Sequence, residues 1–430
     1  MEKFLTIRGL VQEKLMKSKD FKIILFTQIV GLICSGILNF AMALHILDLT
    51  GSATIFSTIV SISFIPTIII GPIGGILADR LPKKLLLMIA DTVKACLIVI
   101  LAITLFLGIE TVVLIGIILT VMITFTTIYI PIVASIVPSI VDRKDLVKAN
   151  SLTQGVKSLS RFMAPALGGL LFGIIGIYYL IAGVAILYVI SAITNFFLTL
   201  PKTDKGFDGG IFKAIKNDLR LGFTYILKTN PKIFELAFIL GIIAMTFFSI
   251  LTVALPFVGR VVLEVTEVQF GIAQAATGIS ALFGAIVAGH KKIRPFIMAK
   301  YVNHWTFISA LFSLPIGASM LPGLGLSAEV RFFTFTVGLF FTMAVFSIFN
   351  IIKLATIQRN APADMVGKAT ALALAITAFP VPIMQRIIGE LLDMVGQSYL
   401  GLAILFFAIT LFVFGVGIFK VFLKMFANKA

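Results

Sequence analysis

Long apolar stretches, each bounded by a few polar or basic residues, repeat along the whole chain. A bilayer core of about 30 Å is crossed by roughly 20 apolar residues in a helix, because lipid offers no partner for unpaired backbone groups. The sequence contains twelve runs of this kind, at residues 24–47, 53–78, 85–107, 111–137, 152–175, 178–200, 234–258, 270–288, 297–321, 332–354, 369–388 and 400–422. The pattern therefore predicts an all-α integral membrane protein with twelve transmembrane helices.

The connecting segments are short except for one near the middle of the chain. This exception predicts a division into a cytoplasmic N-terminal segment (1–22), a first six-helix bundle (23–200), a linker (201–232), a second six-helix bundle (233–422) and a tail (423–430). Within the linker, residues 210–228 place apolar side chains at helical spacing with basic residues between them. We expect an amphipathic helix on the inner membrane face, or alternatively a regulatory or partner-binding segment.

The chain has 35 Lys and Arg against 19 Asp and Glu, a formal charge of +16, which in a soluble protein would suggest a nucleic-acid partner. With twelve spans, all the basic residues except Arg260, Arg331 and Arg386 lie on or near one side of the membrane. Basic loops are typical of the cytoplasmic side, so both termini and the linker are predicted to be cytoplasmic. The charge then indicates contact with an anionic inner leaflet of the plasma membrane rather than with nucleic acid.

The residues that carry most enzyme and metal chemistry are sparse. Cys34 and Cys96 lie inside apolar runs without a metal-ligand spacing, and the three histidines are not clustered in sequence. The sequence contains neither an HExxH motif nor a nucleophile elbow nor a phosphate-binding glycine loop. We therefore expect no metal, no cofactor and no enzymatic activity.

The loop after the second run reads GGILADRLPKK over residues 74–84. It resembles the signature loop of the major facilitator superfamily, G-x-L-A-D-R-x-G-R/K-K, and departs from it at Pro82. The resemblance implies two pseudo-symmetric six-helix halves, and a conformational latch formed by Gly75, Asp79, Arg80, Lys83 and Lys84. Gly75 is expected to let two helices approach closely, and Asp79 to bond backbone N–H groups of a neighbouring helix or a cation.

Other stretches narrow the resemblance. Residues 47–53, 138–141, 149–152 and 358–362 are similar to the branch that holds macrolide efflux proteins and the enterobactin exporter. Residues 164–169, with Pro165, Gly168 and Gly169, are similar to the antiporter motif G-P-x-x-G-G with one glycine replaced. Small residues and proline are also common in membrane helices, so ordinary tight packing is the alternative.

In the fold that the resemblance implies, the first, fourth, seventh and tenth spans line a central substrate cavity. Polar and adaptable apolar residues in these spans are the candidates: Gln28, Asn39, Tyr129, Met245, Phe248 and Asn350. Each polar candidate has an alternative role, because such side chains routinely form hydrogen bonds inside membrane bundles.

Ionisable groups inside spans are costly and are functional candidates by default. Asp91 and Lys94 share one helix face and are expected either to neutralise each other or to include a proton site. Lys157 and Arg161 form either a structural tie to an acid such as Asp79 or Asp142, or a site for an anionic group. Glu235 is the second candidate proton site. The first run has no acid and the fourth has no base, although many proton-coupled drug antiporters of the family have both.

The leading functional hypothesis is a secondary active exporter of amphiphilic, drug-like or macrolide-like small molecules, driven by proton antiport and acting as a monomer. One alternative is an exporter or flippase of an anionic amphiphile, such as a siderophore or a lysolipid, with Lys157 and Arg161 as the anion site. A different class, a membrane sensor or scaffold without transport, is the second alternative.

Overall fold

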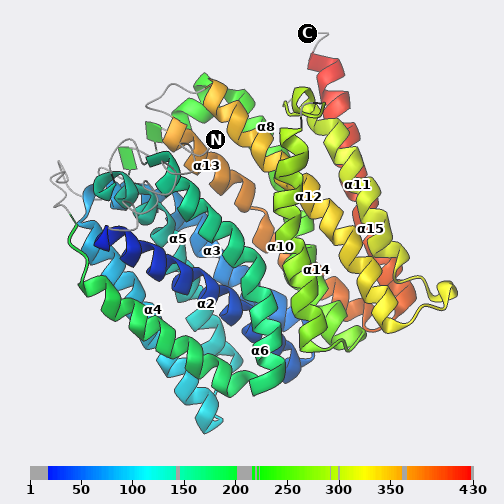
Figure 1. Ribbon diagram of the computed structural model, residues 1–430. Helices are drawn as coiled ribbons and strands as arrows, with labels where there is room; N and C mark the ends of the chain where they lie inside the picture. Colours follow the sequence, from blue (N-terminus) through cyan, green and yellow to red (C-terminus); the bar gives the residue numbers. More distant parts are fainter. Residues whose placement is uncertain are drawn as a thin grey trace, which may run out of the picture. The chain divides into compact units, whose positions relative to one another are not determined.

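The computed structural model describes residues 18–141, 146–200, 216–217, 220–221, 223–290, 292–298, 301–360 and 366–427, apart from some individual side chains. These residues are almost entirely helical, as the apolar runs predict (Figure 1). The longer helices are α2 (Lys19–Thr50), α3 (Ala53–Arg80), α4 (Lys83–Leu107), α5 (Val112–Ile140), α6 (Leu146–Phe196), α8 (Pro231–Ser249), α10 (Glu267–Gly289), α11 (Val302–Ala318), α12 (Ala328–Asn360), α13 (Val366–Ala378), α14 (Val381–Val395) and α15 (Tyr399–Ala427).

Within the described residues, nine helical stretches are long and apolar enough to cross a membrane. The difference from twelve has an identifiable basis. α6 is a 51-residue stretch that contains the fifth and sixth predicted runs, and Gly176 interrupts its helical geometry with φ 73°. This left-handed conformation suits glycine, which has no Cβ to clash. The helix α11 has only 17 residues, and the described apolar stretch of α15, Tyr399–Val413, is also shorter than a span. The count of twelve stays a prediction.

The seventh predicted run forms four consecutive helical segments of different types. α8 continues through the π-helical segment η3 (Ile250–Ala254), the short α9 (Leu255–Phe257) and a second π-helical segment, η4 (Val258–Val262). Pro256 lies between the two π-helical segments. Helix geometry therefore departs from the regular α pattern at η3 and η4, because each π-helical turn inserts an extra residue. Such turns are often found at functional sites.

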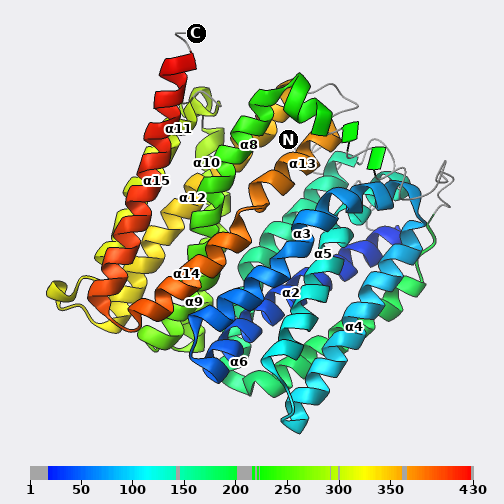
Figure 2. The same ribbon diagram turned by 180° about the vertical axis from the view of Figure 1, so that it is seen from behind.

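The eleventh predicted run is broken in its middle. α13 ends at Ala378 and α14 begins at Val381, and the two helices follow one another across a short non-helical break (Figure 2). Pro380 has no backbone N–H and therefore cannot continue the hydrogen-bond ladder. The run is thus two helices of 13 and 15 residues rather than one continuous helix.

Residue contacts divide the chain into two compact units. The first unit contains residues 1–41 and 69–215, and the second contains residues 42–68 and 216–430. In the first unit α4 packs against α5 and α6. In the second unit α8 packs against α13 and α14, and α11 packs against both α12 and α15 (Figure 1). Residues 42–68, which we assigned by sequence to the bundle 23–200, are grouped by their contacts with the second half of the chain.

Part of the predicted amphipathic helix, residues 210–215, 218, 219 and 222, lies outside the described residues. At its end, Tyr225 and Ile226 are buried in the second unit against Ile233, Ala369 and neighbouring apolar side chains. Phe223 is exposed. Ile226 is therefore covered by protein, whereas we expected it to belong to the membrane-facing side of this helix.

Candidate functional site

The signature loop begins at the C-terminal turn of α3. The side chains of Gly75, Asp79 and Arg80 lie outside the described part of the structure, so their latch role stays a prediction. The close approach expected at Gly75 therefore also stays a prediction, but the neighbouring Gly74 does lie close to another helix. A Cβ at Gly74 would lie 3.3 Å from Cγ of Pro131 and 3.5 Å from Cα of Ile128, on α5.

The two lysines of the signature loop bind the ends of neighbouring helices in the first unit. Nζ of Lys83 donates a hydrogen bond to the carbonyl of Ser135 at 2.9 Å, and Nζ of Lys84 donates to that of Phe196 at 2.9 Å. These carbonyls lie near the C-terminal ends of α5 and α6, where helices carry partial negative charge. Both lysines therefore hold the start of α4 against two helix ends.

The antiporter-like motif forms a tight contact between α6 and α2. A Cβ at Gly168 would lie 3.1 Å from Cδ1 of Phe40, and a Cβ at Gly36 would collide with the side chain of Ala164. Pro165 lies inside α6, and Gly169 is buried. Small residues here have a direct packing role, and the antiport role of the motif stays a prediction.

A buried ion pair lies in the first unit. Asp91 and Lys94 of α4 are 1% and 2% exposed, and Nζ of Lys94 is 2.7 Å from Oδ1 of Asp91. Oδ2 of Asp91 accepts hydrogen bonds from Ser191 Oγ at 3.0 Å and Asn195 Nδ2 at 2.7 Å, both on α6. A buried charge needs this kind of pairing, because an isolated ion is strongly destabilised away from water.

The lysine of this ion pair is also enclosed by aromatic rings. Its Nζ lies 4.9 Å from the ring centre of Tyr129 and 5.4 Å from that of Tyr188. Tyr129, a candidate cavity residue, shares a hydrogen bond of 3.3 Å with Thr27 on α2. The cluster thus joins α2, α4, α5 and α6 around one compensated charge pair, and the role of Asp91 as a proton site stays a prediction.

The other two first-unit cavity candidates differ in burial. Gln28 is buried, and its Nε2 donates to the carbonyl of Thr153 at 3.4 Å. Its Oε1 has no hydrogen-bond partner among the described residues. Asn39 is exposed. Gln28 has therefore acquired a partner within the bundle, which was the alternative role for each polar candidate.

The second-unit cavity candidates are all half-buried. The ring of Phe248 lies 5.6 Å from that of Phe64, centre to centre. Nδ2 of Asn350 donates to the carbonyl of Phe346 on its own helix at 3.2 Å. Met245 lies one turn before Ser249 on α8. Met245 and Phe248 thus contribute apolar, adaptable side chains within this unit, whereas Asn350 bonds its own helix.

The remaining charged candidates are only partly described. Lys157 is half-buried and is not free of interactions, while the side chain of Arg161 lies outside the described residues. Glu235 is exposed near the start of α8. In the part of the chain that the structure describes, no group of three His, Cys, Asp or Glu side chains could hold a metal ion.

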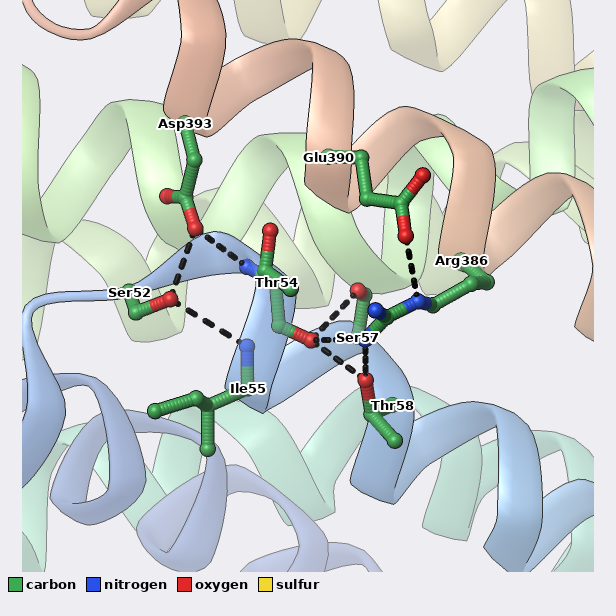
Figure 3. Close-up of polar contacts among 8 residues, drawn as sticks. All are labelled: Ser52, Thr54, Ile55, Ser57, Thr58, Arg386, Glu390 and Asp393. Atoms are coloured by element: carbon green, nitrogen blue, oxygen red, sulfur yellow. Dashed lines mark hydrogen bonds and ion pairs between the residues drawn. The ribbon is translucent and has the colours of Figure 1, made fainter.

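The structure reveals an arrangement that sequence reasoning missed, between α14 and the start of α3. The carboxylate of Asp393 accepts hydrogen bonds from Ser52 Oγ at 2.6 Å and the Thr54 N–H at 2.8 Å (Figure 3). It also accepts the Ala53 N–H at 2.7 Å. Ser52 Oγ in turn accepts the N–H of Ile55 at 3.2 Å. The first three N–H groups of α3, which have no partner inside the helix, are all satisfied.

Two further contacts continue this arrangement along α14. Arg386 donates to the carbonyl of Thr54 at 3.2 Å and to the hydroxyl of Thr58, and its Nε lies 2.8 Å from Oε1 of Glu390 (Figure 3). A Cβ at Gly389 would collide with the side chain of Ser57, and it would lie 2.7 Å from the Ala53 carbonyl. We call the set of contacts made by Arg386, Gly389 and Asp393 with residues 52–58 the α3–α14 clasp.

The other two arginines predicted on the outer side also form specific contacts. Arg260 binds both carboxylate oxygens of Asp48, at 2.7 and 3.0 Å, and lies 2.9 Å from Glu267. Arg331 donates to three backbone carbonyls between residues 319 and 326, and its guanidinium lies 4.5 Å from the ring centre of Tyr399. The sequence signal for these roles was present, because only three basic residues were predicted on this side.

The structure also corrects the placement of Lys353. We placed this lysine on the inner side, at the end of the run 332–354, where its amine is expected to reach water. It lies in the candidate span 328–357 of α12 and is only 4% exposed. Its Nζ donates to Thr377 Oγ1 of α13 at 3.2 Å. Hydropathy alone did not reveal this burial, because the covering side chains come from other helices.

Comparisons with known proteins agree with this architecture. The chain is 23% identical over 376 residues to macrolide efflux protein A of Streptococcus pyogenes, covering 86% of this chain and 89% of that protein. It is 25% identical over 324 residues to the uncharacterised transporter YkuC of Bacillus subtilis, covering 70% of this chain and 71% of that protein.

Solved structures share the fold at low sequence identity. The nucleoside transporter NupG superposes with a TM-score of 0.68 at 14% identity, covering 94% of this chain and 98% of that one. A bacterial homologue of the human lysosomal transporter Spinster gives a TM-score of 0.70 at 14% identity, covering 94% and 96%. The family profile of the Major Facilitator Superfamily matches residues 24–383, and the chain therefore belongs to this superfamily of multi-pass membrane transporters rather than to an enzyme family.

Proposed function

We propose that this protein is a secondary active exporter of amphiphilic, macrolide-like small molecules across the plasma membrane, working by alternating access in exchange for protons. The single observation that carries alternating access is the α3–α14 clasp. It fastens the start of α3 to α14 through short polar contacts that can break and re-form, rather than through a large apolar interface. Export is supported by the similarity to proteins named for macrolide efflux.

The proposed architecture has twelve membrane-spanning helices in two six-helix halves, with both termini and the linker in the cytoplasm. α6 would supply two of these spans on either side of Gly176, and α11 and α15 one each. The basic residues of the predicted inner loops would then face the anionic inner leaflet. We propose a monomer, because each half of such a transporter completes the substrate pathway formed by the other.

In the proposed cycle, the contacts of residues 42–68 with the rest of the second unit hold the outer side closed. They comprise the α3–α14 clasp and the bidentate pair between Arg260 and Asp48. Opening to the outside requires these contacts to break, and the charged groups then become hydrated. Because such contacts are individually weak when exposed, the two states can be close in free energy.

The proposed substrate class follows from the half-buried residues of α8 and α3. Phe64, Met245 and Phe248 offer aromatic and thioether surfaces, which adapt to bulky lipophilic molecules without a fixed hydrogen-bond pattern. An anionic amphiphile would instead require a cationic site such as Lys157 with Arg161. Lys157 is not free of interactions, and we therefore place the macrolide-like class first.

The decisive experiment is transport in proteoliposomes loaded with a labelled macrolide. An imposed proton gradient should drive macrolide movement against its concentration gradient, and dissipation of that gradient should abolish accumulation. Equal transport with and without the gradient would contradict proton coupling but not export. A panel containing a siderophore and a lysolipid distinguishes the anionic class, and Asp79→Asn tests the latch. Absence of transport for every compound would favour a sensor or scaffold.

A further inference from the structure

The protein contains two buried lysines whose surroundings are opposite in character. Lys94 is paired with Asp91 at 2.7 Å and enclosed by two tyrosine rings. Lys353, which is 4% exposed, has one hydrogen-bond partner among the described residues, the hydroxyl of Thr377 at 3.2 Å. Lys94 thus has a counter-charge within contact distance, whereas Lys353 has a single neutral oxygen.

The hydroxyl of Thr377 is itself fixed by its neighbours. Thr377 Oγ1 lies 2.7 Å from the carbonyl of Ala373 and 3.4 Å from that of Ala237 on α8. A hydroxyl has one hydrogen, which these carbonyls take, so its lone pairs remain for Nζ of Lys353. An ammonium has three N–H donors and needs three acceptors. In the geometry seen here it would find one.

Additional acceptors are present at the broken end of α13. Pro380 and Pro382 have no N–H groups, so the carbonyls of Ile376 and Ala378 lack the donors that a continuous helix would supply. At this point α13 also packs closely on α8. A Cβ at Gly241 would lie 3.3 Å from the Ile376 carbonyl oxygen and 3.4 Å from that of Thr377. The end of α13 therefore offers carbonyls without their usual helical donors, together with the negative end of a helix dipole, inside a candidate span.

Few charged groups accompany Lys353 on the helices around it. Its own helix has no charged residue between Arg331 and Lys353. On α8 the described charged side chain is Glu235, which is exposed and forms no ion pair with Lys353, and Lys228 precedes this helix. On α10 the charged residue is Glu267, which pairs with Arg260. The side chains of Lys232, Arg359 and Lys368 lie outside the described residues.

We propose that Lys353 is the proton-carrying group of this transporter, and that the break between α13 and α14 decides whether it holds a proton. The proposal rests on the proton-coupled export proposed above. In the present geometry, with one acceptor among the described residues, the neutral amine leaves fewer N–H donors without a partner than the ammonium would. When the break turns the carbonyls of α13 toward Nζ, the ammonium gains the acceptors it needs, and Lys353 takes up a proton. Returning to the present geometry releases the proton.

The same break leads directly to the α3–α14 clasp. α14 carries Arg386, Gly389 and Asp393, which contact residues 52–58. It also carries the buried Gln385, whose Nε2 donates to Thr252 Oγ1 at 3.0 Å in the π-helical segment η3. A change at residues 378–381 therefore moves a helix that holds the outer contacts, which links the charge on Lys353 to the state of the clasp. The broken helix has the form that transporters use for ion sites.

The test compares Lys353→Met, which is always neutral, with Lys353→Arg, which is always charged. Each variant is reconstituted in proteoliposomes and assayed for macrolide accumulation driven by a proton gradient, and for macrolide counterflow without a gradient. We expect both variants to lose gradient-driven accumulation and to retain counterflow. Retained counterflow also shows that the variants are folded.

The two variants separate a proton-carrying role from a structural one. If the role of Lys353 is only to place a positive charge next to α13, Lys353→Arg should retain gradient-driven accumulation. This result would overturn the proposal for Lys353 but not the proposed export. If the wild type does not respond to the gradient, proton coupling itself fails and the proposal fails with it. Loss of counterflow in both variants would likewise assign Lys353 a structural role.

Thr377 provides a second test that leaves the lysine in place. Thr377→Val removes the acceptor at nearly constant volume, and Thr377→Ser keeps it. We expect the pH profile of gradient-driven transport to shift in Thr377→Val and to remain at the wild-type position in Thr377→Ser. Identical pH profiles in the wild type and both variants would contradict the proposed site.

Discussion

The carboxylate of Asp393 accepts the backbone N–H of Ala53 at 2.7 Å, across 340 residues of sequence. Asp393 lies in the last turn of α14, and Ala53 is the first residue of α3. A helix N-terminus has unpaired N–H groups and a partial positive charge, so a carboxylate there forms strong, directional hydrogen bonds. The contact is nevertheless exposed to solvent on one side, which makes it suitable for a connection that opens and closes.

Replacing Asp393 should loosen the α3–α14 clasp without unfolding the protein. Asp393→Asn removes the charge, and we expect a loss of about 1 kcal/mol, roughly a fivefold shift of the equilibrium toward the open clasp. Buried Ser61, one turn beyond Ser57, is a suitable reporter position. In a background lacking Cys34 and Cys96, a Ser61→Cys reporter should be labelled faster by a membrane-impermeant maleimide when Asp393 is replaced.

The neighbouring exposed residue Met394 supplies the control for this experiment. Met394→Ala changes a side chain that makes no polar contact in the clasp and should leave the labelling rate unchanged. Equal labelling rates in the wild type and Asp393→Asn would mean that the Asp393 contacts do not hold this end of α3 in place.

A methyl group at Gly389 should disrupt the same clasp by a steric route. Its Cβ would collide with Ser57 and meet the backbone of Ala53, so α14 must move away from α3. Overpacking of this kind costs about 1–3 kcal/mol. We expect Gly389→Ala to lower the thermal unfolding temperature of the purified protein in detergent, and to raise labelling of the Ser61→Cys reporter.

Gly183 of α6 provides the matched substitution, since no atom lies within 4 Å of the Cβ that it would gain. Gly183→Ala should therefore be neutral or stabilising by up to about 1 kcal/mol, because alanine favours a helix more than glycine does. If both variants behaved alike, the close approach at Gly389 would not be a real constraint.

The helical framework was predictable because membrane thickness sets the length of each apolar run. The break at 379–380 also had a sequence signal, the pair Pro380 and Pro382, although the run 369–388 was treated as one helix. The pairing of Asp91 with Lys94 followed from their spacing on one helix face. These features depend on residues close to each other in the sequence.

Features that depend on partners far away in sequence were not predictable. Lys353 looked like an inner-loop lysine because it lies near the end of an apolar run, where long side chains usually reach water. Its burial depends on packing by α8 and α13, which hydropathy does not report. Asp393 likewise gives no sequence signal of its role, because its partners at residues 52–54 are contributed by another helix. The close approach at Gly74 also depends on residues of α5, Ile128 and Pro131, that are distant in sequence.

Two glycines on α2 should respond in opposite ways to the same substitution. A Cβ at Gly36 would collide with Ala164 of the antiporter-like motif, whereas a Cβ at Gly31 would meet nothing within 4 Å. We expect Gly36→Ala to destabilise the protein by about 1–3 kcal/mol through overpacking. Gly31→Ala should be neutral or slightly stabilising. Thermal unfolding of the two purified variants checks this directly.

The origin of the Gly36 effect can be tested on the opposing helix. Ala164→Gly removes the methyl group that a Cβ at Gly36 would strike, and it should recover part of the stability lost in Gly36→Ala. Absence of any recovery in the double variant would place the strain elsewhere. Recovery would establish that the antiporter-like motif acts, at least in part, by letting α2 and α6 approach closely.

The buried pair of Asp91 and Lys94 should show strong energetic coupling. Asp91→Asn leaves Lys94 without its counter-charge, and Lys94→Met leaves a buried carboxylate, so each single change should cost about 3–5 kcal/mol. The double variant removes both charges and should be much less destabilised than the sum of the two. A double-mutant cycle on unfolding free energies measures this difference.

An exposed pair on α14 provides the comparison for this cycle. Arg386 and Glu390 are 2.8 Å apart, but their side chains are 43% and 44% exposed, and such pairs contribute about 0–1 kcal/mol. Their coupling energy should therefore be several times smaller than that of Asp91 with Lys94. Similar coupling energies for the two pairs would contradict the burial of the first. Strong coupling would mean that Asp91 keeps its charge for Lys94. The proton-carrying role would then fall to a group such as Lys353, which has no counter-charge among the described residues.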